Sequence, residues 1–364
     1  MAKKKFSAGL TFIACLLALI IGFAAAFFIY TYVNRESGGD VYVSGDLSIH
    51  FMELGNDRTG DSIYIKAGNT DILIDAGSTR ASSNTTASYM DEYITDGTLE
   101  FVIVTHADED HIAGFAGSTS SPSIFDRYDC EVIIDFARTN KNTAVYKDYV
   151  MQRDEAVAAG AKHYTALQCW NNADGAKRTY EVSNGIEMEI LYNYYYENES
   201  DDENNYSVCL MFNQGDTHFL FTGDLEEDGE SRLVDNNDLP EVELFKAGHH
   251  GSKTSSTDKL LQVIRPKRVC VCCCAGTDEY TDTKENQFPT QAMIDRVAPY
   301  TDRVYVTSQV DESAASGYRS MNGNIVVTSN RNGVSVECSN NTTVLKDTEW
   351  FKNNRTMPDA WKAA

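Results

Sequence analysis

The chain has 364 residues, of which 42% are hydrophobic and 11% aromatic, and its formal net charge is −23. This composition excludes a disordered chain and is sufficient for a buried core. The negative charge works against general binding to nucleic acid or anionic lipid, because such binding needs Lys and Arg side chains that neutralise phosphates. It does not exclude a local site that holds one phosphate through a metal ion.

The first 35 residues predict a cytoplasmic basic tip and a transmembrane signal anchor. Residues 6–33 contain no charged side chain and are mostly apolar. As a helix of about 28 residues they would extend about 42 Å, more than the roughly 30 Å of a bilayer core. Three lysines precede this segment, which predicts a cytoplasmic amino terminus in a single-pass protein of the cell membrane, with everything after Arg35 outside. Secretion after signal-peptide cleavage is the alternative, although the apolar cores of signal peptides are usually about 7–15 residues long.

The remainder divides into a linker at 36–46, one folded domain at 47–345 and a C-terminal tail at 346–364, for which the sequence suggests no role. Only four of the 31 basic residues and none of the 54 acidic ones precede residue 36, so the part expected outside the membrane has a net charge of −27.

From residue 47 onward, short apolar segments alternate with helical ones, which predicts a layered α/β domain. Asn184-Gly185 predicts a hairpin turn, and Gly160 predicts the end of a helix. The acidic segment 194–205 is expected to be a solvated surface loop. Helices are expected at 142–159, 255–264 and 290–297, and strands at 62–67, 71–75, 101–105, 131–136, 178–183, 186–192, 206–213, 217–222, 242–246, 269–274, 304–307 and 325–328.

Four side chains that commonly bind metals follow the strand expected at 101–105, namely His106, Asp108, Asp110 and His111. Imidazole nitrogen and carboxylate oxygen are usual ligands of zinc and manganese. Alternate residues of an extended loop point the same way, so His106 and Asp108 could hold one ion while Asp110 and His111 serve a second. The alternative, an acidic loop with two incidental histidines, does not explain why four such residues fall within six positions.

Two weaker signals lie further along the chain. His249 and His250 follow the strand expected at 242–246, and Asp224 follows the strand expected at 217–222. Taken alone, an adjacent histidine pair is a weak indication of a ligand, and an aspartate after glycine is most often a turn residue. His50, His163 and His218 are expected to be packed or surface side chains.

These motifs, taken in order, resemble those of the metallo-β-lactamase-fold hydrolases, and most closely those of the hydrolase domain of ComEC-type DNA-uptake proteins. The motifs are His106-x-Asp108-x-Asp110-His111, Gly223-Asp224 and His249-His250-Gly251-Ser252. Further likenesses are Glu53-Leu54-Gly55-Asn56 with Gly60-Asp61-Ser62, Leu73-Ile74-Asp75-Ala76-Gly77, and Asn205-Tyr206-Ser207. The resemblance extends over about residues 47–338 and implies an α/β, four-layer αβ/βα sandwich with its metal site at one edge of two sheets.

The resemblance also implies the roles of individual residues. His106 and Asp108 would hold one divalent ion, Asp110 and His111 a second, Asp224 would bridge them, and His250 would complete the set. Asp110 and His249 would be catalytic, His249 as a proton donor, and the order of the two histidines stays open. The ions would be zinc or manganese, since Asp108 stands where the family usually has histidine. A hydroxide bridging the ions would attack a phosphoester, and Asp75 would support the loop from behind.

Some features depart from the family's pattern or lie outside it. Residues 57–59 are an insertion in the opening motif, and Asn286-Gln287-Phe288-Pro289 stands where this branch commonly has Tyr-Gly-His-Pro. Lys246, Ser252 and Lys253 could contact a phosphate or could be ordinary polar residues beside a loop. Cys270, Cys272, Cys273 and Cys274 are expected to be core residues, because they lack the paired spacing of a thiolate metal site.

The predicted function is therefore a membrane-anchored, extracytoplasmic dinuclear metal-dependent hydrolase, expected to be a phosphodiesterase. The negative charge makes long nucleic acid a weaker candidate substrate than a phosphoester of a cell-envelope polymer. Two alternatives remain open: hydrolysis of a carboxyl derivative such as a lactone, thioester or β-lactam, and a non-catalytic binding protein on the same fold.

Overall fold

The structure is a computed structural model that describes residues 47–362. The anchor expected at 1–35 and the linker expected at 36–46 lie outside the described residues. Among the helices between residues 47 and 362, none is long and apolar enough to cross a membrane.

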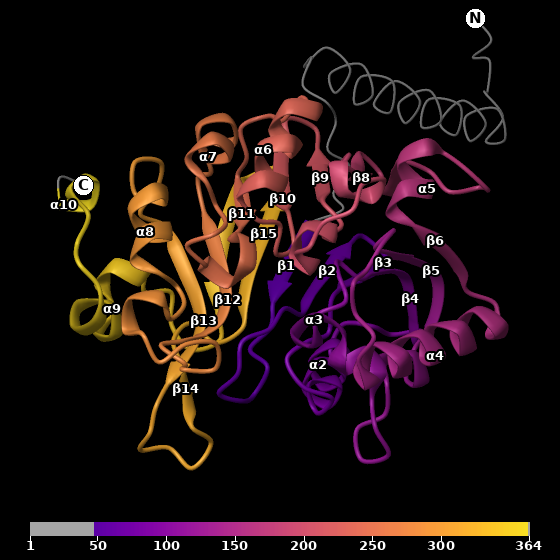
Figure 1. The fold of residues 1–364 in the computed structure, drawn as a ribbon, viewed down its shortest axis with the longest axis horizontal. Coiled ribbons are helices and arrows are strands. Elements are labelled where there is room, and N and C mark those ends of the chain that lie inside the picture. The colour runs from indigo at the N-terminus through magenta and orange to yellow at the C-terminus, as the bar shows by residue number, and fades with distance from the viewer. Residues whose placement is uncertain (1–46, 363–364) are drawn as a thin grey trace, which may run out of the picture. The chain divides into compact units, whose positions relative to one another are not determined.

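Two eight-stranded sheets form the centre of the domain (Figure 1). The first sheet has the order β16-β15-β1-β2-β3-β4-β5-β6 and is parallel from β3 to β6. Its strands are β1 (Leu47–Phe51), β2 (Ile63–Ala67), β3 (Thr70–Ile74), β4 (Thr98–Ile103), β5 (Asp129–Asp135), β6 (Lys162–Thr165), β15 (Ile325–Asn330) and β16 (Gly333–Cys338).

The second sheet has the order β14-β13-β12-β11-β10-β9-β8-β7 and is parallel from β10 to β13. Its strands are β7 (Thr179–Ser183), β8 (Ile186–Ile190), β9 (Leu210–Gln214), β10 (Thr217–Phe221), β11 (Leu244–Lys246), β12 (Val269–Ala275), β13 (Val304–Val310) and β14 (Tyr318–Ser320). The predicted hairpin at Asn184-Gly185 joins β7 to β8.

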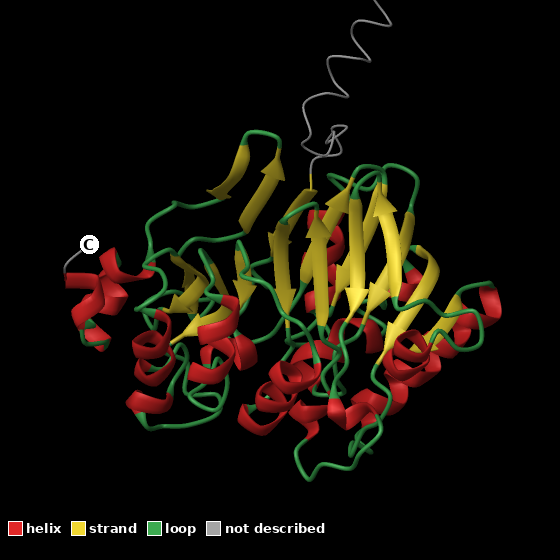
Figure 2. Cartoon of the chain, turned by 90° about the horizontal axis from the view of Figure 1, so that it is seen from above, coloured by secondary structure: helices red, strands yellow, loops and turns green. Residues whose placement is uncertain are grey.

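Helices cover the outer sides of the two sheets, and Figure 2 shows them gathered outside the strands. Helix α4 illustrates how the sequence sets their ends. The Thr143 side chain accepts a hydrogen bond from the Tyr146 N–H at its start, and the helix ends at Gly160, whose φ of 130° favours glycine. The helices are α2 (Ser82–Met90), α3 (Glu109–Ala116), α4 (Ala144–Ala159), α5 (Ala166–Asn171), α6 (Glu227–Asn236), α7 (Asp258–Ile264), α8 (Gln291–Val297), α9 (Glu349–Asn354) and α10 (Asp359–Lys362).

Strand β12 shows how the layers pack. Successive side chains of a strand point to opposite faces, and here Cys270 and Cys272 join a core that includes Ile49 of the first sheet. Val271 and Cys273 join a second core that includes Leu261 of α7. The second sheet is thus buried on both faces, between the first sheet and its own helices. This is the layered α/β arrangement that the resemblance implied, and it confirms the four cysteines as buried, free core residues.

The end of the chain packs onto the same domain. Trp350, Phe351 and Trp361 are buried in the second core, and the Trp361 indole N–H donates to the Thr301 carbonyl over 2.9 Å. Residues 349–362, assigned to a tail from the sequence, therefore contribute to the core beside α8.

The expectation of a solvated loop at 194–205 holds for Glu197, Glu199 and Asp201, which are exposed, but is wrong for both ends of the segment. This segment contains the 3₁₀ turn η2 (Tyr194–Tyr196) and the start of η3 (Glu203–Tyr206), and Tyr196 and Glu203 are buried. The Tyr196 hydroxyl accepts the Cys209 N–H over 3.0 Å while its ring enters the core. Composition alone could not show that these polar and aromatic side chains turn inward.

Candidate metal centre

The predicted ligands lie at the carboxyl ends of parallel strands. His106 follows β4 and His111 lies in the first turn of α3, Asp224 follows β10, and His250 follows β11. Carboxyl ends of neighbouring parallel strands meet at one edge of a sheet, and here the edges of the two sheets face each other. The fold therefore brings together side chains from segments more than 100 residues apart.

Backbone hydrogen bonds hold the start of α3 at this edge of the sheets. The Asp61 N–H donates to the Asp110 carbonyl over 3.1 Å, and the Ala76 N–H donates to the His111 carbonyl over 2.9 Å. A Cβ atom on Gly77 would lie only 1.4 Å from the Asp110 carbonyl oxygen. Glycine is therefore required at position 77 for this close approach.

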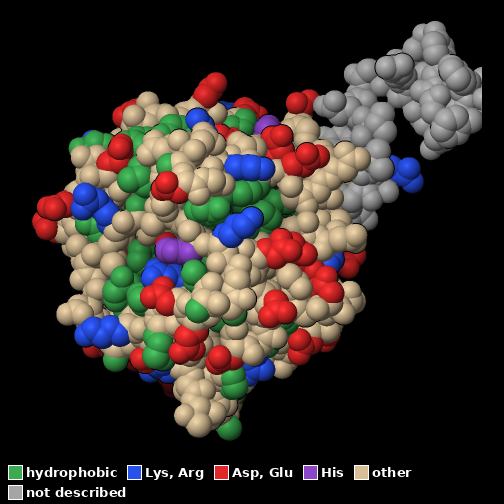
Figure 3. All heavy atoms as spheres, turned by 90° about the vertical axis from the view of Figure 1, so that its right-hand side faces the viewer, with side chains coloured by type: hydrophobic (Ala, Val, Ile, Leu, Met, Phe, Trp, Pro, Cys, Tyr) green, Lys and Arg blue, Asp and Glu red, His purple; other side chains and the backbone are tan. Residues whose placement is uncertain are grey.

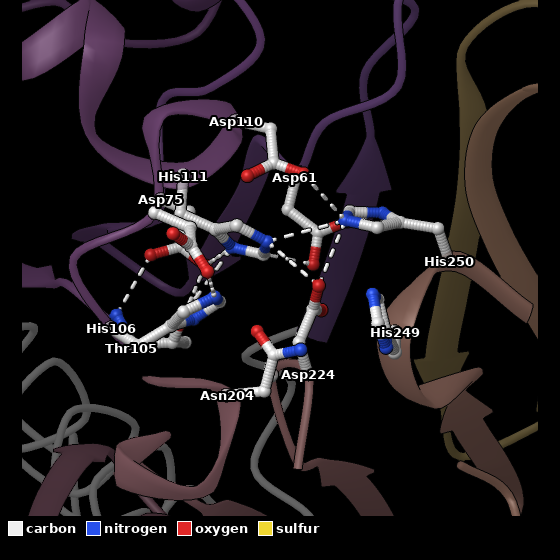
Figure 4. Close-up of polar contacts among 12 residues, drawn as sticks. Asp61, Asp75, Thr105, His106, Asp110, His111, Asn204, Asp224, His249 and His250 are labelled. Carbon is white, nitrogen blue, oxygen red and sulfur yellow. Dashed lines mark hydrogen bonds and ion pairs between the residues drawn. The ribbon is translucent and has the colours of Figure 1, made fainter. Parts of the chain in front are cut away.

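Four predicted ligands surround one point (Figure 4). The Nε2 atoms of His111 and His250 are 3.2 Å apart, and Asp224 Oδ2 lies 3.2 Å from the first and 3.0 Å from the second. Asp110 Oδ2 lies 3.3 Å from His250 Nε2. Ligands about 2.0–2.1 Å from a tetrahedral ion lie about 3.3 Å from one another. The spacing of His111, Asp224 and His250 therefore fits three ligands of one divalent ion, and Asp110 adjoins them beside His250.

His106 and Asp108 lie beside this cluster and have the features of a second ion position. His106 Nε2 lies 3.6 Å from Asp108 Oδ2, and the rings of His106 and His111 have centroids 4.1 Å apart. The buried His106 Nε2 has no hydrogen-bond partner among the described residues. An unpartnered buried nitrogen is costly, and a metal ion at this position would satisfy it. The other Asp108 oxygen pairs with the Lys141 ammonium.

Asp75 lies behind the cluster, as the resemblance implied. Its carboxylate accepts from the Thr105 N–H over 2.8 Å and from the Thr105 hydroxyl over 2.7 Å, and its Oδ2 lies 2.7 Å from His111 Nδ1. A carboxylate at Nδ1 fixes the ring and its tautomer. His111 therefore turns Nε2 toward the other ligands.

Lys246 does not line the pocket, so the structure does not support a contact to phosphate, one of the two roles left open for this residue. The side chain is only 1% exposed, and its Nζ lies 2.5 Å from Asp61 Oδ2 and 3.1 Å from Asp224 Oδ1. The other Asp61 oxygen lies 3.2 Å from His250 Nδ1. Asp61 also belongs to a buried group with His111, Asp224 and His250 whose candidate ligand atoms all lie within 4.8 Å. Because Asp61 already meets Lys246 and the back of His250, we interpret it as a support for the ligands.

The charges in the cluster reinforce one another. Burial alone would lower the pKa of His111 and His250, but Asp224 and other nearby carboxylates raise both pKa values well above the usual range. Burial would raise the pKa of Asp224, but His250, His111 and Lys246 hold that pKa well below its usual range. The carboxylates thus hold protons on the imidazoles, in positions where a divalent cation could replace them.

Of the adjacent histidines, His250 reaches the cluster and His249 lines the pocket above it. His249 Nδ1 lies 3.2 Å from Glu226 Oε1 and 3.3 Å from the Thr254 hydroxyl. Both histidines have left-handed backbone conformations, with φ of 46° for His249 and 52° for His250. For residues with a side chain this conformation costs of the order of 1–3 kcal/mol each and is typical of functional sites.

A pocket of about 660 Å³ opens above the cluster. It is lined by Asp110, Asp224 and His249, and also by Arg58, Lys141 and Tyr280. The Tyr280 hydroxyl donates to Asp110 Oδ2 over 2.7 Å. Burial and the neighbouring carboxylates raise the pKa of Tyr280, so its phenol stays protonated at neutral pH.

Ser252 and Lys253, the other two residues for which a phosphate contact was left open, do not line this pocket. Ser252 bonds to the Thr254 hydroxyl over 2.9 Å, and Lys253 donates to the Asn286 side chain over 3.0 Å. The remaining histidines are packed as expected. His50 contacts Tyr89, His163 contacts Asp135 and His218 contacts Asn213.

Several residues of the site were missed from the sequence. Asp61 had a signal, because it belongs to the opening motif Gly60-Asp61-Ser62. Arg58, Lys141 and Tyr280 had none, since each reaches the pocket from a loop without a recognisable motif. Glu203 was assigned to a loop, yet it accepts the Ala107 N–H over 3.2 Å and the Asn140 N–H over 2.6 Å. It thereby joins the metal-binding loop to the segment that carries Lys141.

Comparison with known proteins agrees with this architecture. The sequence pattern of the metallo-beta-lactamase superfamily matches residues 55–122 and 201–275 of this chain, and these two ranges contain all the predicted ligands. The chain is 27% identical over 222 residues to ComE operon protein 3 of Bacillus subtilis, covering 58% of this chain and 24% of that protein. It is 28% identical over 115 residues to Recombination protein 2 of Haemophilus influenzae, covering 32% of this chain and 13% of that protein. The chain thus spans a quarter or less of the curated relatives that it matches.

Among solved structures, a metallo-β-lactamase of Cronobacter sakazakii is similar at a TM-score of 0.31 and 12% identity, covering 52% of this chain and 71% of that one. The sheets, the ligand cluster and the matched residue ranges lead to one conclusion. The chain has the metallo-β-lactamase fold, with a candidate metal centre at the shared edge of its two sheets.

Proposed function

We propose that the chain is a dinuclear metal-dependent phosphodiesterase that acts outside the cytoplasm. The observation that carries this proposal is the ring of Asp110, His111, Asp224 and His250 below an open pocket. The facing atoms of His111, Asp224 and His250 are 3.0–3.2 Å apart, and Asp110 Oδ2 lies 3.3 Å from His250 Nε2. The unpartnered His106 Nε2 beside Asp108 supports a second ion position. Two divalent ions, zinc or manganese, would lower the pKa of a water molecule and offset charge on a phosphoryl group.

The residues around the ions have separate tasks in this proposal. His106 and Asp108 would hold one ion. The second ion would be held by Asp110, His111 and His250, and Asp224 would contact both ions. The Asp224 carboxylate is fixed through Oδ1 by Lys246, which leaves Oδ2 directed at the ring.

His249 is the proposed proton donor. Its Nδ1 faces Glu226, whose pKa is lowered to about 2 because hydrogen bonds and the charge of His249 outweigh burial. The carboxylate at Nδ1 fixes the orientation of the ring. Nε2 of His249 is then free to give a proton to the leaving-group oxygen.

The charge distribution favours a small or neutral-ended phosphoester, such as a substituent of a cell-envelope polymer, over long nucleic acid. Of the cations that line the pocket, Arg58 is paired with Glu279 and Lys141 with Asp108. On the face shown in Figure 3, acidic side chains are scattered among isolated basic ones. Binding a long polyanion requires many unpaired Lys and Arg side chains.

A hydrolysis assay tests the proposed function. The full chain loaded with Mn²⁺ or Zn²⁺ should hydrolyse bis-(p-nitrophenyl) phosphate, and Asp110→Ala or Asp224→Ala should abolish that activity. Asp228→Ala, an exposed carboxylate only four positions after Asp224, serves as the matched control and should retain it. Equal rates in the wild type and both ligand variants would refute the proposal. A β-lactam, a lactone and linear DNA run in parallel would show which bond the site prefers.

We also propose that residues 6–33 anchor the chain in the membrane with the amino terminus in the cytoplasm. The protein should then sediment with membranes after an alkaline carbonate wash, and external protease should digest the folded domain in spheroplasts. A shortened amino terminus on a protein in the soluble fraction would indicate cleavage instead.

A further inference from the structure

The loop between β12 and α8 brings an exposed tyrosine to the candidate metal centre. Tyr280 is 52% exposed, one of three large hydrophobic side chains left exposed among the described residues. Its hydroxyl nevertheless donates to Asp110 Oδ2, the oxygen that lies 3.3 Å from His250 Nε2. A half-exposed ring with its hydroxyl on a proposed metal ligand is positioned to meet a molecule entering the pocket.

The inserted residues 57–59 hold this loop in place. Glu279, next to Tyr280, accepts the Thr59 N–H over 2.8 Å through one carboxylate oxygen. The other oxygen pairs with the Arg58 guanidinium at 2.9 Å. The insertion that departs from the opening motif thus has a structural task, because it clamps the tyrosine loop against the pocket.

Phe288 links Tyr280 to the proposed proton donor. Its ring centroid lies 5.6 Å from that of Tyr280 and 5.6 Å from that of His249, and the side chain is buried. One aromatic wall therefore carries two polar groups, the phenol of Tyr280 and the imidazole of His249, along the same pocket.

We propose that Tyr280 is a substrate-contacting residue whose hydroxyl donates a hydrogen bond to a phosphoryl oxygen, and that the Arg58–Glu279 clamp holds it there. This inference rests on the proposed function. Asp110 would be a weaker hydrogen-bond acceptor if it held a cation, and the Tyr280 hydroxyl could then donate to an anionic oxygen in the pocket. A neutral donor suits this pocket, because the Arg58 and Lys141 charges are already balanced by Glu279 and Asp108.

Titration calorimetry can measure how tightly inorganic phosphate binds to the Mn²⁺-loaded full chain. This measurement tests the inference without requiring turnover. Tyr280→Phe keeps the ring and removes the hydroxyl. It should weaken phosphate binding about tenfold, the usual effect of losing a hydrogen bond to a charged group, while Mn²⁺ affinity stays within twofold of the wild type. Tyr192→Phe is the matched control, because Tyr192 also donates to a surface carboxylate, Glu197, over 2.8 Å.

A double-mutant cycle tests the clamp. The paired change Arg58→Gln with Glu279→Gln, which leaves the net charge of the pocket unchanged, should weaken phosphate binding severalfold on its own. It should add nothing in the Tyr280→Phe background, since both changes remove the same contact. Additive effects would show that the clamp does not act through Tyr280 and would overturn that part of the inference.

The outcomes separate this inference from the proposed function. Phosphate binding without hydrolysis of the diester would refute the phosphodiesterase but leave the test of Tyr280 intact. Loss of Mn²⁺ affinity in Tyr280→Phe with unchanged phosphate binding to the loaded protein would show that the tyrosine only positions Asp110, and would overturn the substrate contact. A wild-type protein that binds Mn²⁺ but not phosphate would overturn it as well.

Discussion

Lys246 Nζ lies 2.5 Å from Asp61 Oδ2 beneath the candidate metal centre, and both side chains are excluded from solvent. Burial would lower the pKa of Lys246, but the attraction of Asp61 and Asp224 raises that pKa well above its usual range. The side chain therefore keeps its positive charge. This cation neutralises carboxylates that would otherwise repel one another in the metal-free protein.

Lys246→Met should therefore destabilise the metal-free protein by about 3–5 kcal/mol, the usual cost of leaving a buried charge without its partner. Urea unfolding after chelation measures the change. Lys267→Met is the control, because Lys267 pairs with Glu243 at the surface, where an ion pair contributes about 1 kcal/mol or less. Equal unfolding midpoints for the two variants would contradict the role assigned to Lys246.

Metal binding should depend on pH. In the metal-free protein the surrounding carboxylates raise the pKa of His111 and His250, so these rings carry protons at neutral pH. A cation must displace those protons, so its apparent affinity should fall as the pH is lowered. Calorimetric titration with Mn²⁺ in two buffers of different ionisation enthalpy should give different heats, and identical heats would mean that no protons are released.

His50 should make the folded domain sensitive to mild acid. Burial lowers the pKa of His50 to about 4, while in the unfolded chain it is about 6.5. Between these values the unfolded state binds a proton that the folded state does not, so stability falls as the pH drops from about 6.5 to 4. The loss reaches about 3 kcal/mol and is absent above pH 7. His50→Gln should show a smaller loss between pH 7 and 4.5, measured by urea unfolding, whereas a loss equal to that of the wild type would exclude His50 as the source.

Trp361 should stabilise the domain although it lies only three residues before the last residue of the sequence. It is 4% exposed and donates to the Thr301 carbonyl, so Trp361→Ala should cost about 3 kcal/mol. Trp170→Ala, at a partly exposed ring beside Arg178, should cost less. Thermal unfolding of both variants measures the difference, and an unchanged transition for Trp361→Ala would show that the end of the chain is dispensable.

The sequence predicts those parts of the fold that are determined locally. The alternation of Val and Cys predicts strand β12, and the glycine after α4 predicts the end of that helix. Both predictions succeed because these features depend on only a few neighbouring residues. Helix α2 was missed, since its buried face carries Ser82, Ser83 and Thr86 and so lacks an apolar period.

The same division applies to the site. His106, Asp110 and His111 are recognisable because the ligands follow one strand at fixed spacing. The role of Lys246 stayed open because its burial depends on the opposite sheet, and Tyr280 was missed because its partner Asp110 lies 170 residues away. Only the folded structure brings such pairs together.

The ring of ligands draws Asp110 and His111 from the first sheet and Asp224 and His250 from the second. A bound ion would therefore act as a reversible cross-link between the two halves of the sandwich, a role that disulfides fill in many exported proteins. In the described part of the chain every cysteine is a free thiol, so metal supply, and not the redox state of the surroundings, would decide how tightly the halves are joined.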